Sequence, residues 1–180
     1  ARKEVKDILA YLRLIVNPSD GISFDRIVNF PTRGIGKTTL EKIHKLANEN
    51  DYTYLRVLGE LDMLSIGAKQ KKALHEFNQL IHKYRTSYKE QGASSLTKDL
   101  LADIDIQNYY ENQNTQEALE RWGNVQELLN SITDFQDNKD ESGLRGFLEE
   151  VSLLSDIDRW NESDKSVTLM TIHSAKGLEF

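Results

Sequence analysis

Apolar residues recur every three or four positions along most of this chain, which is the spacing of one buried face of an α-helix. The clearest case covers residues 2–16, whose apolar stripe consists of Val5, Ile8, Leu9, Leu12, Ile15 and Val16. The same period predicts further helices over residues 24–30, 37–50, 52–61, 69–90, 95–104, 115–135 and 144–154. We therefore expect a mainly α fold made of several packed helices.

One segment departs from this helical period. Residues 167–172 (VTLMTI) are β-branched or apolar and predict a strand of the kind found in a buried parallel sheet. A single strand cannot form a sheet, so we expect it to pair with segments outside this chain. Together with Ala1, which is not an initiator methionine, this orphan strand predicts that the chain is a piece of a larger protein. Residues 107–112 are expected to be irregular, and residues 156–166 a charged linker.

The most distinctive local feature is a turn with two glycines around one isoleucine, Gly34-Ile35-Gly36, directly before a predicted helix. Lys37 and Thr38 stand in the first turn of that helix. Glycine tolerates positive φ and places no side chain between a ligand and the backbone. The first N–H groups of a helix lack partners within the helix and can bind phosphate. The turn is therefore a candidate phosphate site.

Three interpretations of this turn are open. A nucleotide-binding Walker A loop needs a glycine five positions before the glycine of its GK[ST] sequence, and Pro31 stands there instead. An ordinary helix start that follows a glycine turn is the plainest alternative. The third is a hairpin that grips the DNA backbone, because Pro-x-x-Gly-Ile-Gly followed by x-x-x-Leu-x-x-Ile resembles the helix-hairpin-helix pattern. Two residues are inserted between the proline and the first glycine.

The composition narrows the class of protein. A length of 180 residues with 38% hydrophobic residues and a mean hydropathy of −0.57 predicts one or two water-soluble domains, and no apolar run approaches the length of a membrane span. The absence of cysteine rules out disulfides and thiolate metal sites, which fits a reducing, cytoplasmic location. The four histidines are scattered, so the sequence predicts no metal site.

The distribution of charge is more informative than the net charge of −6. Residues 1–98 carry 17 Lys and Arg against 11 Asp and Glu, whereas residues 99–180 carry 6 against 18. An acidic protein can still bind nucleic acid through one basic face. Such a face is expected in the first half of the chain.

Four segments together resemble the UvrD/PcrA/Rep group of superfamily 1 DNA helicases. They are RKEVKDILAYLR (2–13), TRGIG (32–36), FLEEVSLLSD (147–156) and TLMTIHSAKGLEF (168–180), the last of which resembles helicase motif V. The resemblance implies that residues 10–160 form the helical accessory subdomain called 2B. It also implies that residues 1–9 and 161–180 are stubs of the second RecA-like motor domain, the latter containing a linker and motif V.

The resemblance also assigns site residues. The hairpin is expected to contact phosphates of duplex DNA without reading sequence, through Thr32, Arg33, Gly34, Ile35, Gly36, Lys37 and Thr38. His173 would contact the single strand, and Glu179 would contact the nucleotide of the parent helicase. ATP and Mg²⁺ are the implied cofactors of the parent, with none expected in this chain. The implied partners are duplex and single-stranded DNA at a junction, the remaining helicase domains, and repair or replication proteins.

The leading hypothesis is thus an accessory, regulatory duplex-binding subdomain of an ATP-dependent 3′-to-5′ DNA helicase. No Walker A lysine or Walker B acidic pair is present, so this chain alone is expected neither to bind nor to hydrolyse ATP. The alternative is a helical protein-interaction or autoinhibitory module with little DNA binding of its own, which the acidic second half favours. A stand-alone helix-hairpin-helix DNA-binding protein is a third hypothesis, and the orphan strand argues against it.

Overall fold

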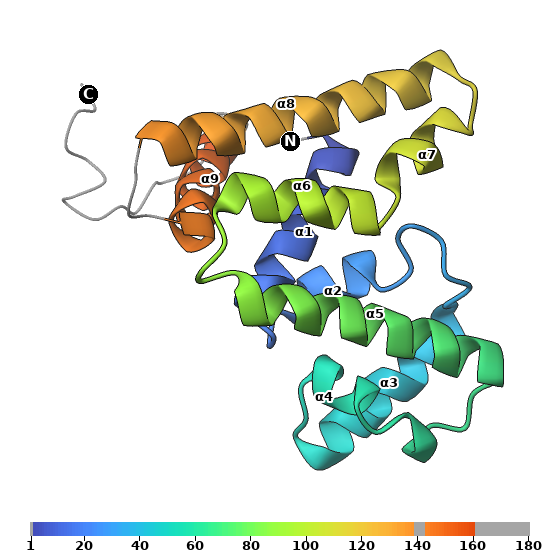
Figure 1. Cartoon of the computed structure of the whole chain (residues 1–180). Coiled ribbons are helices and arrows are strands. Elements are labelled where there is room, and N and C mark those ends of the chain that lie inside the picture. The colour runs from blue at the N-terminus through green and yellow to red at the C-terminus, as the bar shows by residue number, and fades with distance from the viewer. Residues whose placement is uncertain (1, 139–142, 161–180) are drawn as a thin grey trace.

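The computed structural model describes residues 2–138 and 143–160, and this part of the chain is built from helices (Figure 1). In chain order the elements are α1 (Lys3–Val16), α2 (Gly21–Ile27), α3 (Lys37–Asn50), α4 (Tyr54–Leu58), the 3₁₀ helix η1 (Leu61–Met63), α5 (Ala68–Ser87), α6 (Ala93–Asp103), α7 (Ile106–Glu111), α8 (Gln116–Asn138) and α9 (Gly143–Trp160). The predicted mainly α class is confirmed.

Helix α1 is the centre of the molecule. It packs against α2, α5, α8 and α9, and its residues are buried on nearly every side, including the two carboxylates Glu4 and Asp7. Its apolar stripe predicts burial of one face only. The wider burial follows from its position, because a helix with neighbours on several sides has no face left for solvent.

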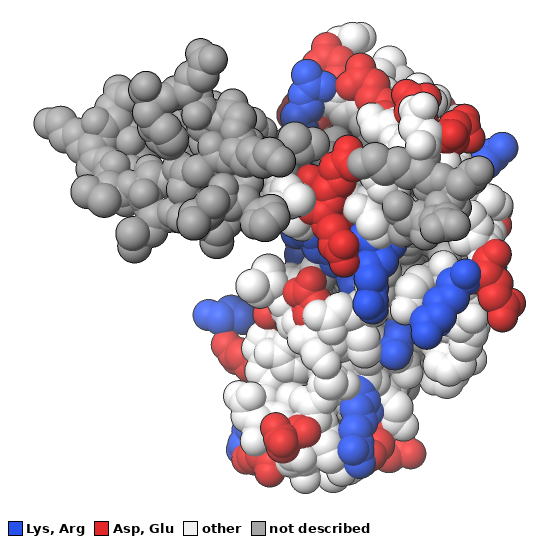
Figure 2. All heavy atoms as spheres, turned by 90° about the vertical axis from the view of Figure 1, so that its left-hand side faces the viewer, with Lys and Arg blue, Asp and Glu red and all other residues white. Residues whose placement is uncertain are grey.

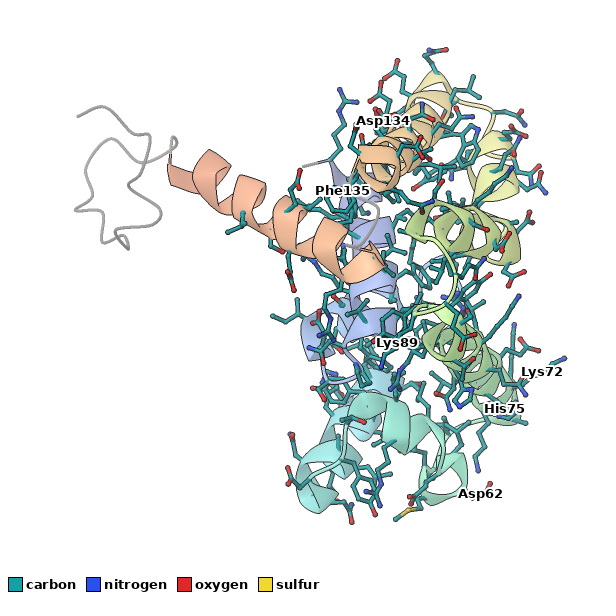
Figure 3. The ribbon with its side chains drawn as sticks, turned by 60° about the vertical axis from the view of Figure 1, so that its left-hand side comes forward. Asp62, Lys72, His75, Lys89, Asp134 and Phe135 are labelled. Carbon is teal, nitrogen blue, oxygen red and sulfur yellow. The ribbon has the colours of Figure 1, made fainter. Side chains whose placement is uncertain are left out.

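The other helices cover the two ends of α1. Helices α6, α7 and α8 pack on one another and lie above in Figure 1, while α3 and α4 lie below, against α5. The last turns of α9 project away from this body (Figure 3). Near the start of α9, Phe147 packs edge-on against Phe135 of α8 with ring centroids 5.5 Å apart. Within the described residues, no helix is long and apolar enough to cross a membrane.

Several predicted boundaries differ from the structure. The segment 107–112 was expected to be irregular, but residues 107–111 belong to α7, which buries Ile106 and Tyr110 against its neighbours. Helix α9 continues through Trp160 and so includes the start of the predicted charged linker. The predicted subdomain boundary after residue 9 lies within α1, and this division into subdomains stays a prediction. The predicted strand at 167–172 lies outside the described residues.

Gly123 lies inside α8 and offers a simple test of that helix. A Cβ at this position would have open space around it, and glycine is about 0.5–1 kcal/mol less favourable than alanine in a helix interior. We expect Gly123→Ala to raise the melting temperature by about 1–4 °C in a calorimetric scan. Gly34→Ala provides the contrast, because Gly34 has a φ of +74° and alanine would be strained there. A loss of stability from Gly123→Ala would contradict the helical geometry at this position.

Candidate nucleic-acid interface

The loop between α2 and α3 holds the glycine turn and is ordered by its own side chains. The Asn29 carboxamide oxygen accepts hydrogen bonds from the backbone N–H groups of Arg33, at 2.9 Å, and Ile35, at 3.0 Å. Ile35 is 2% exposed and anchors the loop in the core. Gly34 adopts a φ of +74°, in the left-handed region that favours glycine. The turn thus has one defined backbone conformation.

The Arg33 side chain points into the protein instead of out to solvent. Its Nη1 donates to the carbonyl oxygens of Phe30, at 2.8 Å, and Ile27, at 3.1 Å, and its Nη2 donates to the Tyr11 hydroxyl at 2.7 Å. The guanidinium carbon lies 5.1 Å from the centre of the Phe77 ring. These contacts hold the Arg33 guanidinium inward in this structure, and its predicted contact with DNA phosphate stays a prediction.

Tyr11 ties this loop to the central helix α1. The residue is fully buried, and its hydroxyl donates a hydrogen bond to the Phe30 carbonyl while it accepts one from Arg33. Burial raises the pKa of the Tyr11 hydroxyl above its ordinary value, although the nearby Arg33 charge opposes the shift. The hydroxyl is therefore protonated at neutral pH and able to donate.

Five of the seven predicted hairpin residues lie on an exposed rim, which we call the α3 rim: Thr32, Gly34, Gly36, Lys37 and Thr38. Helix α3 starts within this rim and has no side-chain cap, since Gly36 is its N-cap residue. The first N–H groups of α3 therefore have no side-chain acceptor, and such groups can bind an anion. Gly36 has a φ of −95°, so the expected positive φ occurs only at Gly34 of the two glycines.

The charge of the α3 rim is modest. Lys37 is 90% exposed at its side chain, and its Nζ lies 3.8 Å from the Glu41 carboxylate one turn later. Lys42, on the next turn, donates from its Nζ to the Ser65 carbonyl, which joins α3 to the segment before α5. The α2–α3 loop and the start of α5 accordingly lie at the same side of the molecule, on the right in Figure 1.

The lysine-rich side of α5 is a solvated helix face in this structure. Lys72 lies 3.8 Å from Glu76, Lys71 lies 3.2 Å from Asp62, and Lys83 lies 2.5 Å from Asp103. Figure 3 shows the Lys72 side chain pointing away from the protein body. Exposed pairs of this kind contribute little to stability and partly neutralise the basic charge.

The acidic half of the chain makes a different surface. In Figure 2, Asp and Glu side chains are numerous along the upper edge, where α8 lies, and Lys and Arg side chains lie beside Asp and Glu side chains further down. The predicted nucleic-acid-binding face in the first half of the chain stays a prediction.

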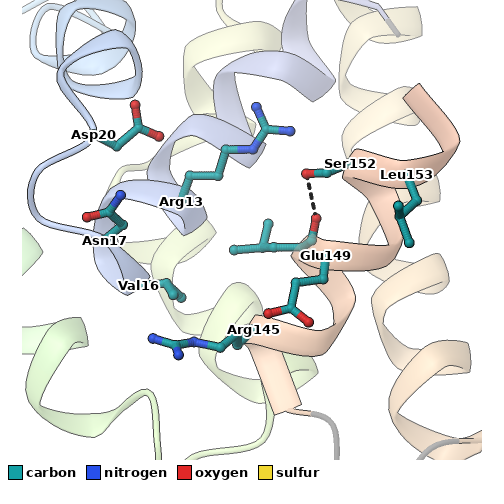
Figure 4. A pocket seen from close by; sticks show the side chains of 9 residues that line it. Arg13, Val16, Asn17, Asp20, Arg145, Glu149, Ser152 and Leu153 are labelled. Atoms are coloured by element: carbon teal, nitrogen blue, oxygen red, sulfur yellow. Dashed lines mark hydrogen bonds between the residues drawn. The ribbon is translucent and has the colours of Figure 1, made fainter. Parts of the chain in front are cut away.

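A hollow of about 750 Å³ lies away from the α3 rim, between the end of α1, the loop to α2, and α9 (Figure 4). It is lined by two arginines, Arg13 and Arg145, and by two carboxylates, Asp20 and Glu149. Both signs of charge are present, so its lining selects no ligand class. Within the described residues there is also no cluster of His, Asp and Glu that could hold a metal ion.

Sequence reasoning located the turn but missed two residues that build it. Asn29 could have been suspected, because Asn before a turn often bonds the backbone a few residues later. No feature of the sequence indicates that Tyr11 supports the turn, since a tyrosine inside a largely apolar helix cannot be distinguished by pattern from other core residues. The predicted positions His173 and Glu179 lie outside the described residues.

The family model of the UvrD-like helicase C-terminal domain matches residues 1–180. The chain therefore belongs to the UvrD-like helicase C-terminal domain family, and the predicted resemblance to UvrD- and PcrA-type superfamily 1 helicases is confirmed.

Individual relatives are ATP-dependent DNA helicases named PcrA. The chain is 37% identical to PcrA of Bacillus subtilis and 36% identical to PcrA of Staphylococcus aureus, in each case over 99% of this chain and 25% of the relative. PcrA of Leuconostoc citreum is 34% identical over the same shares. The chain thus spans about a quarter of the length of these relatives.

Proposed function

We propose that this chain is the duplex-binding accessory subdomain of an ATP-dependent DNA helicase. The observation that carries the proposal is the uncapped start of α3 within the exposed α3 rim. Backbone N–H groups, the hydroxyls of Thr32 and Thr38 and the Lys37 ammonium would bind phosphate oxygens. Such contacts are independent of sequence, because phosphates are the same at every base pair.

The parent protein supplies the chemistry in this proposal. Its motor domains would bind ATP and Mg²⁺ and move in the 3′-to-5′ direction on the single strand, and residues 161–180 would include motif V with His173 and Glu179. Residues 10–160 would form the accessory subdomain and residues 1–9 a stub of the second motor domain. The remaining helicase domains would be the partners of this subdomain, and repair or replication proteins the partners of the whole. The chain by itself would neither bind nor hydrolyse ATP.

A salt titration of duplex binding tests the proposed phosphate contact. Each phosphate contact adds about 0.9 to the slope of log affinity against log salt concentration. We expect Lys37→Ala to weaken binding of a labelled mixed-sequence duplex and to lower this slope by about one contact between roughly 50 and 200 mM salt. Fluorescence anisotropy measures both quantities.

Lys45→Ala is the matched control for this experiment. Lys45 lies on the same helix, is 74% exposed and sits 3.8 Å from Glu49, so it repeats the Lys37–Glu41 pair at the far end of α3. The control should change neither affinity nor slope. Equal effects of the two variants would show that the loss reflects net charge alone and that the α3 rim is not the contact.

The second candidate function is a protein-interaction or autoinhibitory module. Two exposed leucines favour it: Leu119 on α8 is 51% exposed and Leu153 on α9 is 67% exposed, both in the acidic half. Apolar side chains flanked by acidic residues suit a protein partner better than a polyanion. An absence of duplex binding by the wild-type chain at low salt would favour this candidate over the first.

A further inference from the structure

We propose that Tyr11 and Arg33 are positioning residues, which hold the α3 rim in the conformation that meets duplex phosphates and contact no phosphate themselves. The inference rests on the proposed duplex binding and assigns the roles of two residues behind that site. It also changes the role of Arg33, which by its position in the sequence looks like a phosphate-binding cation.

The Arg33 guanidinium binds backbone carbonyls from the end of α2 and from the loop before the glycine turn. Its Nη1 lies within hydrogen-bond distance of four carbonyl oxygens, those of Ile27 and Val28 at the end of α2 and those of Phe30 and Pro31 in the loop, at 2.8 to 3.4 Å. The carbonyls that end a helix carry partial negative charge and attract a cation. One side chain thus fixes the end of α2 relative to the loop that leads to the α3 rim.

Tyr11 connects this arrangement to α1. The second guanidinium nitrogen of Arg33 donates to the Tyr11 hydroxyl, which in turn donates to the Phe30 carbonyl. Tyr11 has no exposed surface, so its hydroxyl cannot reach a ligand on the α3 rim. Any effect of that hydroxyl on DNA binding must therefore pass through the loop.

Arg33 would have to leave these partners to reach a phosphate. Its guanidinium lies 5.1 Å from the Phe77 ring centre and 6.0 Å from that of Tyr11, so aromatic faces as well as carbonyls stabilise its inward position. Within residues 2–138 and 143–153, no carboxylate forms an ion pair with it, and the carbonyl dipoles serve in place of a counter-charge. Swinging outward would remove the Arg33 hydrogen bonds from those carbonyls.

The test is a pair of hydroxyl deletions in the 180-residue chain. Tyr11→Phe removes the hydroxyl behind the loop, and Tyr84→Phe removes the hydroxyl of another tyrosine with almost no exposed surface, which bonds Asp103 at 2.7 Å, away from the loop. Both should lose similar thermal stability. We expect Tyr11→Phe to bind the labelled duplex about three- to tenfold more weakly, because fewer molecules hold the competent loop, while Tyr84→Phe binds as the wild type does. Equal affinities of the two variants would overturn the proposal.

Arg33→Lys separates positioning from contact. Lysine keeps the positive charge but cannot reproduce the planar fork that bonds carbonyls and a hydroxyl together. A positioning role predicts about tenfold weaker duplex binding for Arg33→Lys. When Arg33→Lys and Tyr11→Phe are combined in one chain, the fold-loss of affinity should be smaller than the product of the two single fold-losses, because both changes loosen the same loop. Unchanged affinity of Arg33→Lys would show that charge alone matters and would overturn the proposal.

A failure of the proposed duplex binding is distinguishable from a failure of the positioning role. If the wild-type chain does not bind the duplex at low salt, the proposed function is wrong, and amide hydrogen exchange in the free protein then decides the role of Tyr11. The N–H groups of Arg33 and Ile35, both bonded to Asn29, should exchange several-fold faster in Tyr11→Phe and at the wild-type rate in Tyr84→Phe. Unchanged exchange in Tyr11→Phe would overturn the positioning role.

Discussion

Phe77→Ala is expected to lower the free energy of unfolding by about 3–5 kcal/mol, which is typical of a fully buried phenylalanine. Phe77 is 1% exposed and lies where three helices meet. Its ring packs edge-on against Phe24 of α2, at 6.0 Å between centroids, and Tyr11 of α1, at 6.3 Å, while the Arg33 guanidinium covers it from the loop. Urea unfolding followed by far-UV circular dichroism measures the loss.

Two further variants serve as references for the loss of unfolding free energy in Phe77→Ala. Phe77→Leu keeps most of the buried volume and should lose about 1–2 kcal/mol. Leu119→Ala removes an apolar side chain that is 51% exposed and should stay within about 0.5 kcal/mol of the wild type. A loss below about 1 kcal/mol for Phe77→Ala would contradict the packing of α5 against α1 and α2 described here.

The second large effect is expected at the buried carboxylate Asp7. Its Oδ1 lies 2.7 Å from Nε of Arg26, with the Asp7 side chain 5% exposed and that of Arg26 34% exposed. Asp7→Ala would leave the half-buried Arg26 guanidinium without the carboxylate that pairs with it. Loss of one partner of a buried pair costs about 3–5 kcal/mol, and because water can reach Arg26 in part, we expect about 2–4 kcal/mol. Asp7→Asn keeps an acceptor for Arg26 and should lose less.

The pH dependence of the stability of the Asp7 variants tests the direction in which the pKa of Asp7 is shifted. Burial raises the pKa of Asp7 above 3.8, its ordinary value, and this outweighs the opposing effect of Arg26. A carboxyl with a raised folded-state pKa binds its proton more tightly when folded, so its contribution to stability increases as the pH falls through that pKa toward 3.8. The stability advantage of the wild type over Asp7→Asn should therefore widen between neutral pH and about pH 4. A narrowing gap in urea unfolding would contradict the raised pKa.

The helices could be predicted from the sequence because their apolar positions repeat with the helical period. Residues 3–16 and 37–50 were placed with nearly correct ends, the first stopped by Asn17-Pro18 and the second started by the glycine turn. The short α7 was missed. Its six residues span fewer than two turns, so periodicity gives no signal, and the helix exists because Ile106 and Tyr110 find a buried site beside α8.

The turn at Gly34 to Gly36 was also predictable, but the direction of its neighbours was not. A cation beside a glycine turn suggests a phosphate ligand. For Lys37, whose side chain is 90% exposed, the phosphate contact stays a prediction. Arg33 has the same charge and a neighbouring position, yet its guanidinium points inward. The difference depends on carbonyls that only the folded end of α2 presents and on a tyrosine 22 residues earlier in the chain.

The sequence alone therefore determined the helical class, the family and the position of the glycine turn, because each depends on residues that are close along the chain. The tertiary structure decided which residues around this turn face solvent and which support the loop from inside. It also decided that α1 is enclosed on nearly every side, with Asp7 and Glu4 buried in it. These outcomes depend on contacts between α1, α2, α5 and α8 that no local pattern specifies, since burial and hydrogen bonding are set by residues distant in sequence.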